Sequence, residues 1–292
     1  MGTSTPFGGP GGGTPIVPSW IDDAETGLPS EGLPDNDAPV EPNPEGTVPP
    51  APVVPPIPPP AANDRFTAAR NSFSRFARSG GNDRASLGRA VSNYVSTSSG
   101  GSRSAAHRMG ASRTAGARLL GFLSGASANG TREALRALNL ESLAGRPIEE
   151  VFLGLADYIC PDGGTIDEGI AREAFIETIA ELAENGITDI DGLNADQIQT
   201  IFELYATHAI EARLCNDIGT KAITLPADPA AAQRVQAQLL DFIRRGVSDA
   251  LTFARTTMQT LTADRVLAFV TGVYEQAFSI LQTLGDAEAG RT

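Results

Sequence analysis

The chain has 292 residues, of which 41% are hydrophobic, and a formal net charge of −13 at pH 7. This length is enough for one or two domains, but no stretch approaches the roughly 18 apolar residues of a membrane span, and the N-terminus lacks the cationic and apolar regions of a secretory signal. Cys160 and Cys215 lack the close spacing of a zinc or redox motif, so we expect a cytoplasmic protein with reduced cysteines and no membrane contact.

Proline and charge divide the chain into three parts. Seventeen of the 21 prolines lie in residues 1–63, which carry eight acidic residues and no lysine or arginine. Residues 64–118 carry ten arginines and two acidic residues, whereas residues 119–292 carry 12 basic and 25 acidic residues. We therefore expect an all-α protein: a disordered Gly/Pro-rich acidic tail (1–63), an Arg/Ser/Gly-rich segment with short helices (64–118) and a helical domain (119–286).

The first 20 residues, here called the leader, combine many glycines and prolines with a few large hydrophobic residues. Glycine loses the most conformational entropy on ordering and proline lacks an amide donor, so the leader holds neither a helix nor an interior strand. It nevertheless contains Phe7, Ile16, Val17 and Trp20, the only tryptophan of the chain. A pure spacer has no reason to expose such side chains, so the pattern predicts a peptide that another protein binds.

The leader also carries a resemblance to a known family. It reads Met-Gly-Thr-Ser, then Gly-Gly-Pro-Gly-Gly-Gly-Thr-Pro, and then Val-Pro-Ser-Trp. In these residues, and in its layout of acidic tail, Arg-rich middle and helical half, the chain resembles the QatB proteins of bacterial Qat anti-phage systems. The resemblance implies a non-enzymatic component that works beside an ATPase, a TatD-type nuclease and a QueC-type enzyme of 7-deazaguanine chemistry (QatC).

The resemblance further implies that the QueC-type enzyme binds the leader and modifies Gly2. The residues that it assigns to partner binding are Gly2, Thr3, Ser4, Phe7, Gly8, Gly9, Pro10, Gly11, Gly12, Gly13, Thr14, Pro15, Val17, Pro18 and Trp20.

The chemistry of Gly2 is compatible with this role. A small second residue allows removal of the initiator methionine, which leaves an α-amine with a pKa of about 7.7 to 8.0 and therefore a neutral, nucleophilic fraction at cellular pH. Glycine has no Cβ to obstruct a narrow tunnel. The simpler alternative is that Met-Gly is a common start. Myristoylation is a rival modification, but its pattern requires Ser or Thr where Pro6 stands.

The tail continues as an acidic, proline-rich stretch from residue 21 to 62. Its prolines at 49, 52, 55 and 58 recur every three residues, which is the period of a polyproline II helix. Residues 49–60 would span about 37 Å in that conformation. We interpret this stretch as a semi-rigid spacer, with a docking ligand for a partner as the alternative.

The Arg-rich segment shows helical spacing of its apolar residues. Two short helices are predicted, the first from Phe66, Ala69, Phe73 and Phe76 and the second from Leu87, Val91 and Tyr94.

A third part of this segment carries an arginine at every fifth position: Arg103, Arg108, Arg113 and Arg118. Five residues advance a helix by about 140°, so these cations would spiral around a single helix. Such a spiral suits contacts with phosphates, which arginine binds in a bidentate manner. The alternative function is therefore a nucleic-acid-binding adaptor that uses residues 65–118. A further alternative is that the acidic parts of the chain itself neutralise the arginines.

The C-terminal half shows the pattern of a helical core with recognisable helix starts. Thr165 and Glu168 form a predicted capping box, Asn194 is a predicted cap, and Asp228 precedes a proline at the first helical position. The apolar stripes that follow these starts consist of Ile166, Ile170, Phe175, Ile179 and Leu182; of Ile198, Phe202, Tyr205 and Ala209; of Val235, Leu239, Phe242, Ile243 and Leu251; and of Val266, Val270, Val273, Ala277 and Leu281.

No motif predicts a catalytic residue, a metal site or a cofactor. His107 and His208 are far apart, and we interpret His208 as a satisfied residue at the border of an apolar face. The only lysine, Lys221, lacks the frame of a P-loop. The glutamates of the C-terminal helices, which include Glu149, Glu150, Glu173, Glu177 and Glu181, are typical of solvated faces. A third and weaker alternative is an autonomous enzyme that uses carboxylates.

Overall fold

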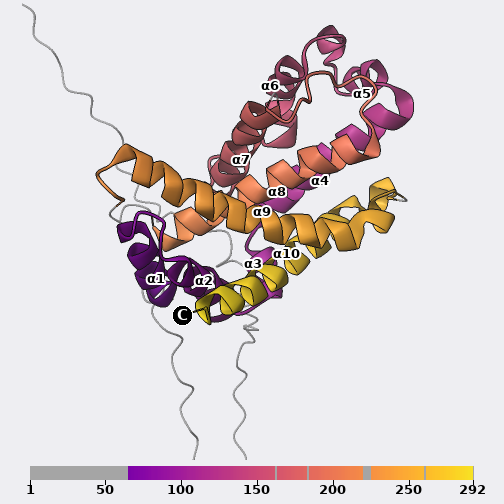
Figure 1. Ribbon diagram of the computed structural model, residues 1–292. Coiled ribbons are helices and arrows are strands. Elements are labelled where there is room, and N and C mark those ends of the chain that lie inside the picture. The colour runs from indigo at the N-terminus through magenta and orange to yellow at the C-terminus, as the bar shows by residue number, and fades with distance from the viewer. Residues whose placement is uncertain (1–64, 162, 183, 220–224, 260, 292) are drawn as a thin grey trace, which may run out of the picture. The chain divides into compact units, whose positions relative to one another are not determined.

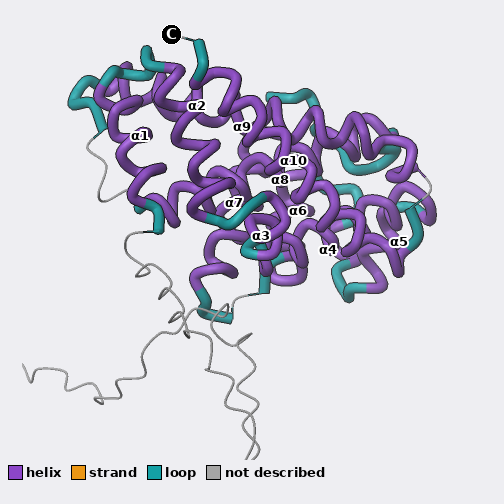
Figure 2. The backbone as a smooth tube through the Cα atoms, turned by 90° about the horizontal axis from the view of Figure 1, so that it is seen from below, coloured by secondary structure: helices purple, strands orange, loops and turns teal. Residues whose placement is uncertain are grey.

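The computed structural model describes residues 65–292, apart from residues 162, 183, 220–224, 260 and 292 and the side chains of residues 256 and 259. The leader, the proline repeat at 49–60 and Lys221 lie outside the described residues. We refer to the described part as the body. It is helical and contains no strand in the residues described, which confirms the all-α prediction (Figure 2).

The body consists of helices joined by short turns. In chain order the α-helices are α1 (Thr67–Arg78), α2 (Arg84–Asn93), α3 (Ser102–His107), α4 (Gly110–Asn129), α5 (Thr131–Ala137), α6 (Ile148–Ile159), α7 (Ile166–Leu182), α8 (Ala195–Ile218), α9 (Pro229–Gln259) and α10 (Val266–Ala289). A π-helical turn, η1 (Tyr94–Ser98), continues α2, and two 3-10 turns, η2 (Glu141–Leu143) and η4 (Ala263–Arg265), precede α6 and α10.

The predicted helices of the Arg-rich segment are confirmed as α1 and α2. The four apolar residues of the first pattern and the three of the second are all buried. Asp83 caps α2, since its carboxylate accepts a hydrogen bond of 2.9 Å from the backbone N–H of Ser86. Amphipathic helices of this length gain most of their stability by packing an apolar face. That face is covered by helices from the other end of the chain.

The last helix, α10, packs along the first helices of the body. Its most extensive contact is with α2, and it also contacts α3, α4 and α9. Figure 1 shows the indigo α1 and α2 beside the yellow end of α10. The α2–α10 contact is close because two glycines meet: a Cβ placed on Gly88 would lie 2.6 Å from the carbonyl oxygen of Gly285. The two ends of the body are therefore one packing unit.

The helices α7 and α8 form the second large contact, and both begin at confirmed caps. Thr165 and Glu168 exchange hydrogen bonds as a capping box at the start of α7. Asn194 caps α8 and pairs with Gln197, which completes a second capping box that the sequence pattern did not identify. The predicted apolar stripe of α7 is buried from Ile170 onward, whereas Ile166, at the first position of the helix, is 55% exposed.

The third predicted start is also confirmed, because the carboxylate of Asp228 accepts hydrogen bonds from the first turn of α9. The apolar stripes predicted for α8, α9 and α10 are buried. Two groups of aromatic rings join the helices: Phe66, Tyr94 and Phe278 in one, and Phe152, Phe175 and Tyr205 in the other.

The expected boundary between residues 118 and 119 falls inside α4, which contacts α5, α7, α8 and α10. The division of the chain at 63 and 118 stays a prediction.

Candidate functional site

The point where the body begins is fixed by contacts to η1. The guanidinium of Arg65 donates a hydrogen bond to the carbonyl oxygen of Ser98. The ring of Phe66 stacks on that of Tyr94, with 5.8 Å between the centroids. The predicted modification site Gly2 and the predicted partner-binding residues of the leader lie outside the described residues. The first described residues are thus held firmly by the body.

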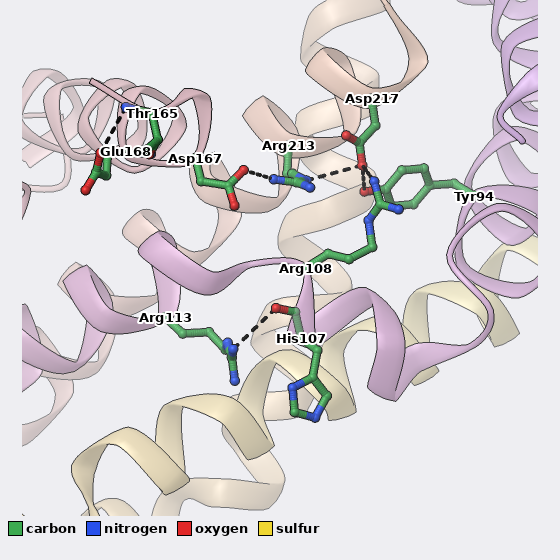
Figure 3. A network of polar contacts seen from close by, with 9 residues as sticks. All are labelled: Tyr94, His107, Arg108, Arg113, Thr165, Asp167, Glu168, Arg213 and Asp217. Carbon is green, nitrogen blue, oxygen red and sulfur yellow. Dashed lines mark hydrogen bonds and ion pairs between the residues drawn. The ribbon is translucent and has the colours of Figure 1, made fainter. Parts of the chain in front are cut away.

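A buried carboxylate, Asp217, organises a network between the Arg-rich segment and α8 (Figure 3). Its Oδ2 atom accepts hydrogen bonds from the hydroxyl of Tyr94 and from a guanidinium N–H of Arg108, both at 2.9 Å, and from Nε–H of Arg213 at 3.2 Å. The side chain of Asp217 is only 7% exposed. One carboxylate thereby joins η1, the end of α3 and the last turn of α8.

Arg213 extends the network to α7. Its guanidinium pairs with Asp167, in the first turn of α7, as well as with Asp217 (Figure 3). Although burial alone would lower the pKa of Arg213, the two carboxylates raise it above its ordinary value. Burial, followed by the charge of Asp217, raises the pKa of Tyr94. Buried side chains stay charged when they are paired in this way. Removal of one partner then leaves the others as uncompensated buried charges, which is strongly destabilising.

Further arginines of the first helices gather at the C-terminal end of α8. Nε–H of Arg70 donates a hydrogen bond of 2.7 Å to the carbonyl oxygen of Ile218, the last residue of α8. The guanidinium of Arg108 also lies over the ring of Phe66, 5.1 Å from its centroid. The last carbonyls of a helix carry a partial negative charge that cations stabilise. The arrangement therefore cancels charge at a helix end within the body.

The four arginines at five-residue intervals do not lie on one helix, so that prediction was wrong. Arg103 is on α3, Arg108 ends it, and Arg113 and Arg118 are on α4. The break between α3 and α4 occurs where the side chain of Met109 turns into the core, at 2% exposure, and Gly110 begins the next helix. Burial of Met109 and pairing of Arg108 with Asp217 outweigh continuation of a single helix.

Each of these four arginines contacts a residue of the C-terminal half. Arg103 pairs with Glu275, Arg108 with Asp217, Arg113 donates to the hydroxyl of Thr271, and Arg118 donates to the carbonyl oxygen of Tyr158. Arg84 and Arg89 likewise contact Glu288 and the carbonyl oxygen of Ala289 at the end of α10. These contacts support the alternative in which the acidic half of the chain neutralises the arginines.

The two cysteines are free. Burial raises the pKa of both Cys160 and Cys215 to about 12, which keeps them as thiols at neutral pH. The thiolate is the nucleophilic form, so neither environment activates its cysteine.

Among the residues described, no group of three or more His, Cys, Asp or Glu side chains is arranged to hold a metal ion. None of the described helices is both long enough and apolar enough to cross a bilayer.

His208 differs from its prediction as a satisfied border residue. It is only 5% exposed, and its Nε2 atom has no hydrogen-bond partner among the described residues. The nearest carboxylate oxygens belong to Glu181, 3.5 Å from Nε2, and Glu211, 3.7 Å from Nδ1. The packing of α7 against α8 buries the imidazole, which the spacing along α8 alone did not predict. His107, in contrast, is exposed.

The Asp217 network was missed from the sequence, although one signal was present. Arg213 occupies a position on α8 that continues the buried face, between Ile210 and Leu214, and Asp217 follows it at i+4. A charged residue within an apolar stripe indicates a buried partner, because an unpaired buried charge is very costly. The identity of the partners Tyr94, Arg108 and Asp167 depends on the tertiary structure.

These observations define an all-α protein in which Arg-rich first helices are bound by ion pairs to an acidic helical half. A family model, described as "Qat anti-phage system associated protein QatB", matches residues 100–281, more than half of the chain. The chain therefore belongs to the QatB family, and it is a component of the Qat anti-phage system. This match confirms the resemblance and covers most of the body. No curated protein and no solved structure matches the chain.

Proposed function

We propose that this QatB protein is a non-enzymatic component that docks the QueC-type enzyme of the Qat system (QatC) and presents Gly2 to it for a 7-deazaguanine-type modification. The observation that carries the proposal is the family match over residues 100–281. The match lies within the body and does not include the leader, whose resemblance to the family rests on its own residues. The ATPase and the TatD-type nuclease are further proposed partners.

The contacts at the start of the body support a protein in which the body docks the partner and the leader presents Gly2. Arg65 and Phe66 are fixed to η1, so the chain that precedes them is attached at one defined point. The Asp217 network joins that point to α7 and α8. Once a partner has bound the body, its binding to the leader of the same chain is intramolecular. The leader is then present at a high effective concentration.

The proposed reaction is amide formation at Gly2. The neutral α-amine attacks an ATP-activated carboxylate on a deazaguanine base, the new bond joins the amine nitrogen to the acyl carbon, and the activating group leaves with the electrons of its carbon–oxygen bond. The amine nitrogen releases a proton. The free amine has a pKa of about 7.7 to 8.0, so its nucleophilic fraction is substantial near neutral pH.

Trp20 provides the test of leader binding. The full chain is titrated with the QueC-type enzyme while tryptophan emission is recorded, with the Trp20→Phe variant as the control that removes the signal of this chain. We expect a saturable change in emission, because Trp20 enters an apolar groove. Binding that is detected by another method but leaves Trp20 emission unchanged would contradict docking through the leader.

The alternative function, a nucleic-acid-binding adaptor, is favoured by one observation. Arg103, Arg75 and Arg78 lie on the exposed surface of the Arg-rich segment, and the side chain of Arg103 is 77% exposed. Phosphate contacts by these residues would give an affinity that falls steeply with salt. The test compares the affinity for nucleic acid of the wild type with that of a variant in which these three arginines are replaced by glutamine. The buried Arg108 stays in place in this variant. Absence of binding at low salt excludes the adaptor.

A further inference from the structure

A pocket of about 480 Å³ lies between α7, α8 and α9, separate from the Asp217 network. Its apolar lining includes Phe73, Val235 and Leu239. Its polar lining includes four glutamates, Glu173, Glu177, Glu181 and Glu211, and no arginine or lysine among the described residues. We name it the glutamate pocket. Its volume is within the range of small-molecule sites, and its charge selects cations.

His208 is the second observation that indicates a ligand in this pocket. It lines the pocket, is buried to more than nine-tenths, and leaves Nε2 without a hydrogen-bond partner in the part of the chain that the structure describes. A buried polar atom without a partner is destabilising, and a bound donor would remove that cost. Glu181 Oε1 lies 3.5 Å from this nitrogen, and Glu211 lies 3.7 Å from Nδ1, the other nitrogen of the ring.

The donor and acceptor types specify the ligand. Carboxylates only accept hydrogen bonds, and Nε2 of an imidazole accepts one when the ring proton is on Nδ1. Arg244 pairs with the other oxygen of Glu181, Oε2, which leaves Oε1 on the side of His208. An ammonium group carries three donors and no acceptor, so it matches this set of acceptors.

The spacing of the remaining glutamates indicates a second ammonium. Glu173, Glu177 and Glu181 are four residues apart on α7, which corresponds to about 6 Å of rise between neighbours. Val235 and Leu239 on α9 supply apolar surface for methylene groups in the same pocket. We propose that the glutamate pocket binds a short aliphatic diamine, with one ammonium at Nε2 of His208 and Oε1 of Glu181 and the other at Glu177 and Glu173.

Calorimetric titration of the full-length chain with 1,4-diaminobutane tests this proposal. The expected result is saturable binding of one diamine per chain, with butylamine about tenfold weaker because it lacks the second charged contact. Tetramethylammonium, which has no N–H donor, is expected not to bind at this site. Equal affinity for the diamine and the monoamine would overturn the proposal.

Two variants and a matched control locate the binding. Glu177→Gln removes one exposed carboxylate and is expected to weaken diamine binding about tenfold. Gln236→Arg places a fixed cation at the lining of the pocket and is expected to abolish binding. Glu149→Gln makes the same change on α6, outside the pocket, and is expected to leave the affinity unchanged.

Gln236→Arg also separates the pocket from the acidic tail, because the eight carboxylates of the tail attract diamines whatever the charge at the pocket. Binding that persists in Gln236→Arg, or that Glu149→Gln weakens as much as Glu177→Gln does, would overturn the proposal. Saturable binding of a lysine-containing peptide in place of the diamine would also overturn it, because the occupant would then be a partner protein.

Discussion

At the scale of single residues, Asp217 is the contact on which the attachment of the Arg-rich segment depends. It neutralises Arg108 and Arg213, whose side chains are 11% and 5% exposed. Replacement by asparagine keeps the shape but leaves two buried guanidinium groups with less compensating charge. We expect Asp217→Asn to lower the free energy of unfolding by about 3 kcal/mol, as measured by denaturant titration.

The matched control for this prediction is Glu275→Gln, which breaks the exposed pair with Arg103. The side chains of this pair are 37% and 77% exposed, so solvent screens the interaction. The expected change is within about 0.5 kcal/mol. Equal effects of the two variants would show that burial does not determine the importance of the ion pairs.

Glu168 supplies a prediction about pH. The hydrogen bond with the hydroxyl of Thr165, and then that with the backbone N–H of Thr165, lowers the pKa of Glu168 below its ordinary value of 4.5. A carboxyl with a lowered folded-state pKa stabilises the fold above its ordinary pKa, and this stabilisation is lost as the pH falls through the folded-state value. Thr165→Ala is expected to cost about 1 kcal/mol at pH 7.

NMR titration of Glu168 measures the same effect directly. In Thr165→Ala the pKa of Glu168 should rise toward 4.5, and the stability difference from the wild type should shrink below that pH. A pKa that is the same in both proteins would contradict the capping box as its cause.

Residue patterns predicted the helix caps and failed for the polar network. Thr165, Asn194 and Asp228 act over three residues of sequence, so local spacing was sufficient to identify them. Asp217 and Tyr94 are 123 residues apart, and no local pattern links them. The burial of His208 was not predicted for the same reason, because it depends on packing against α7, a different helix.

At the scale of helices, the contact between α2 and α10 depends on two small residues. In Gly88→Ala the new methyl group would lie 2.6 Å from the carbonyl oxygen of Gly285. The helices would have to separate, and such overpacking costs about 1 to 3 kcal/mol. The variant is expected to be less stable than the wild type, although alanine is the better helix former.

Gly121→Ala is the control on α4, where no atom lies within 4 Å of the added Cβ. Only the helix propensity changes there, so we expect a gain of about 0.5 to 1 kcal/mol. Thermal unfolding of both variants measures the contrast. A gain in both would mean that α2 and α10 are not in close contact.

The elements were largely predictable because their apolar spacing is regular. The stripes of α1, α8, α9 and α10 and their burial follow from positions such as Phe76, Phe202 and Val270. The division of residues 103–118 into α3 and α4 was not predictable, since the break depends on where Met109 is buried. Which helices pack together, such as α2 with α10, depends on contacts between distant parts of the chain.

At the scale of the whole molecule, the charge pattern has two explanations with different consequences. A basic segment of 64–118 beside an acidic half predicts either a nucleic-acid surface or internal pairing. The ion pairs of Arg84, Arg103 and Arg108 with the C-terminal half favour internal pairing. The Arg-rich helices then hold the start of the body in place, and the leader remains the proposed contact for a partner enzyme.

The central claim is that Gly2 is presented to the QueC-type enzyme and modified there. The mass of the N-terminal peptide, recorded after co-expression with that enzyme, tests it most directly, with a catalytically inactive enzyme as the control. The account predicts a chain that begins at Gly2 and carries the mass of a deazaguanine acyl group on its α-amine, only with the active enzyme. An unmodified Gly2 beside an active enzyme would contradict the account.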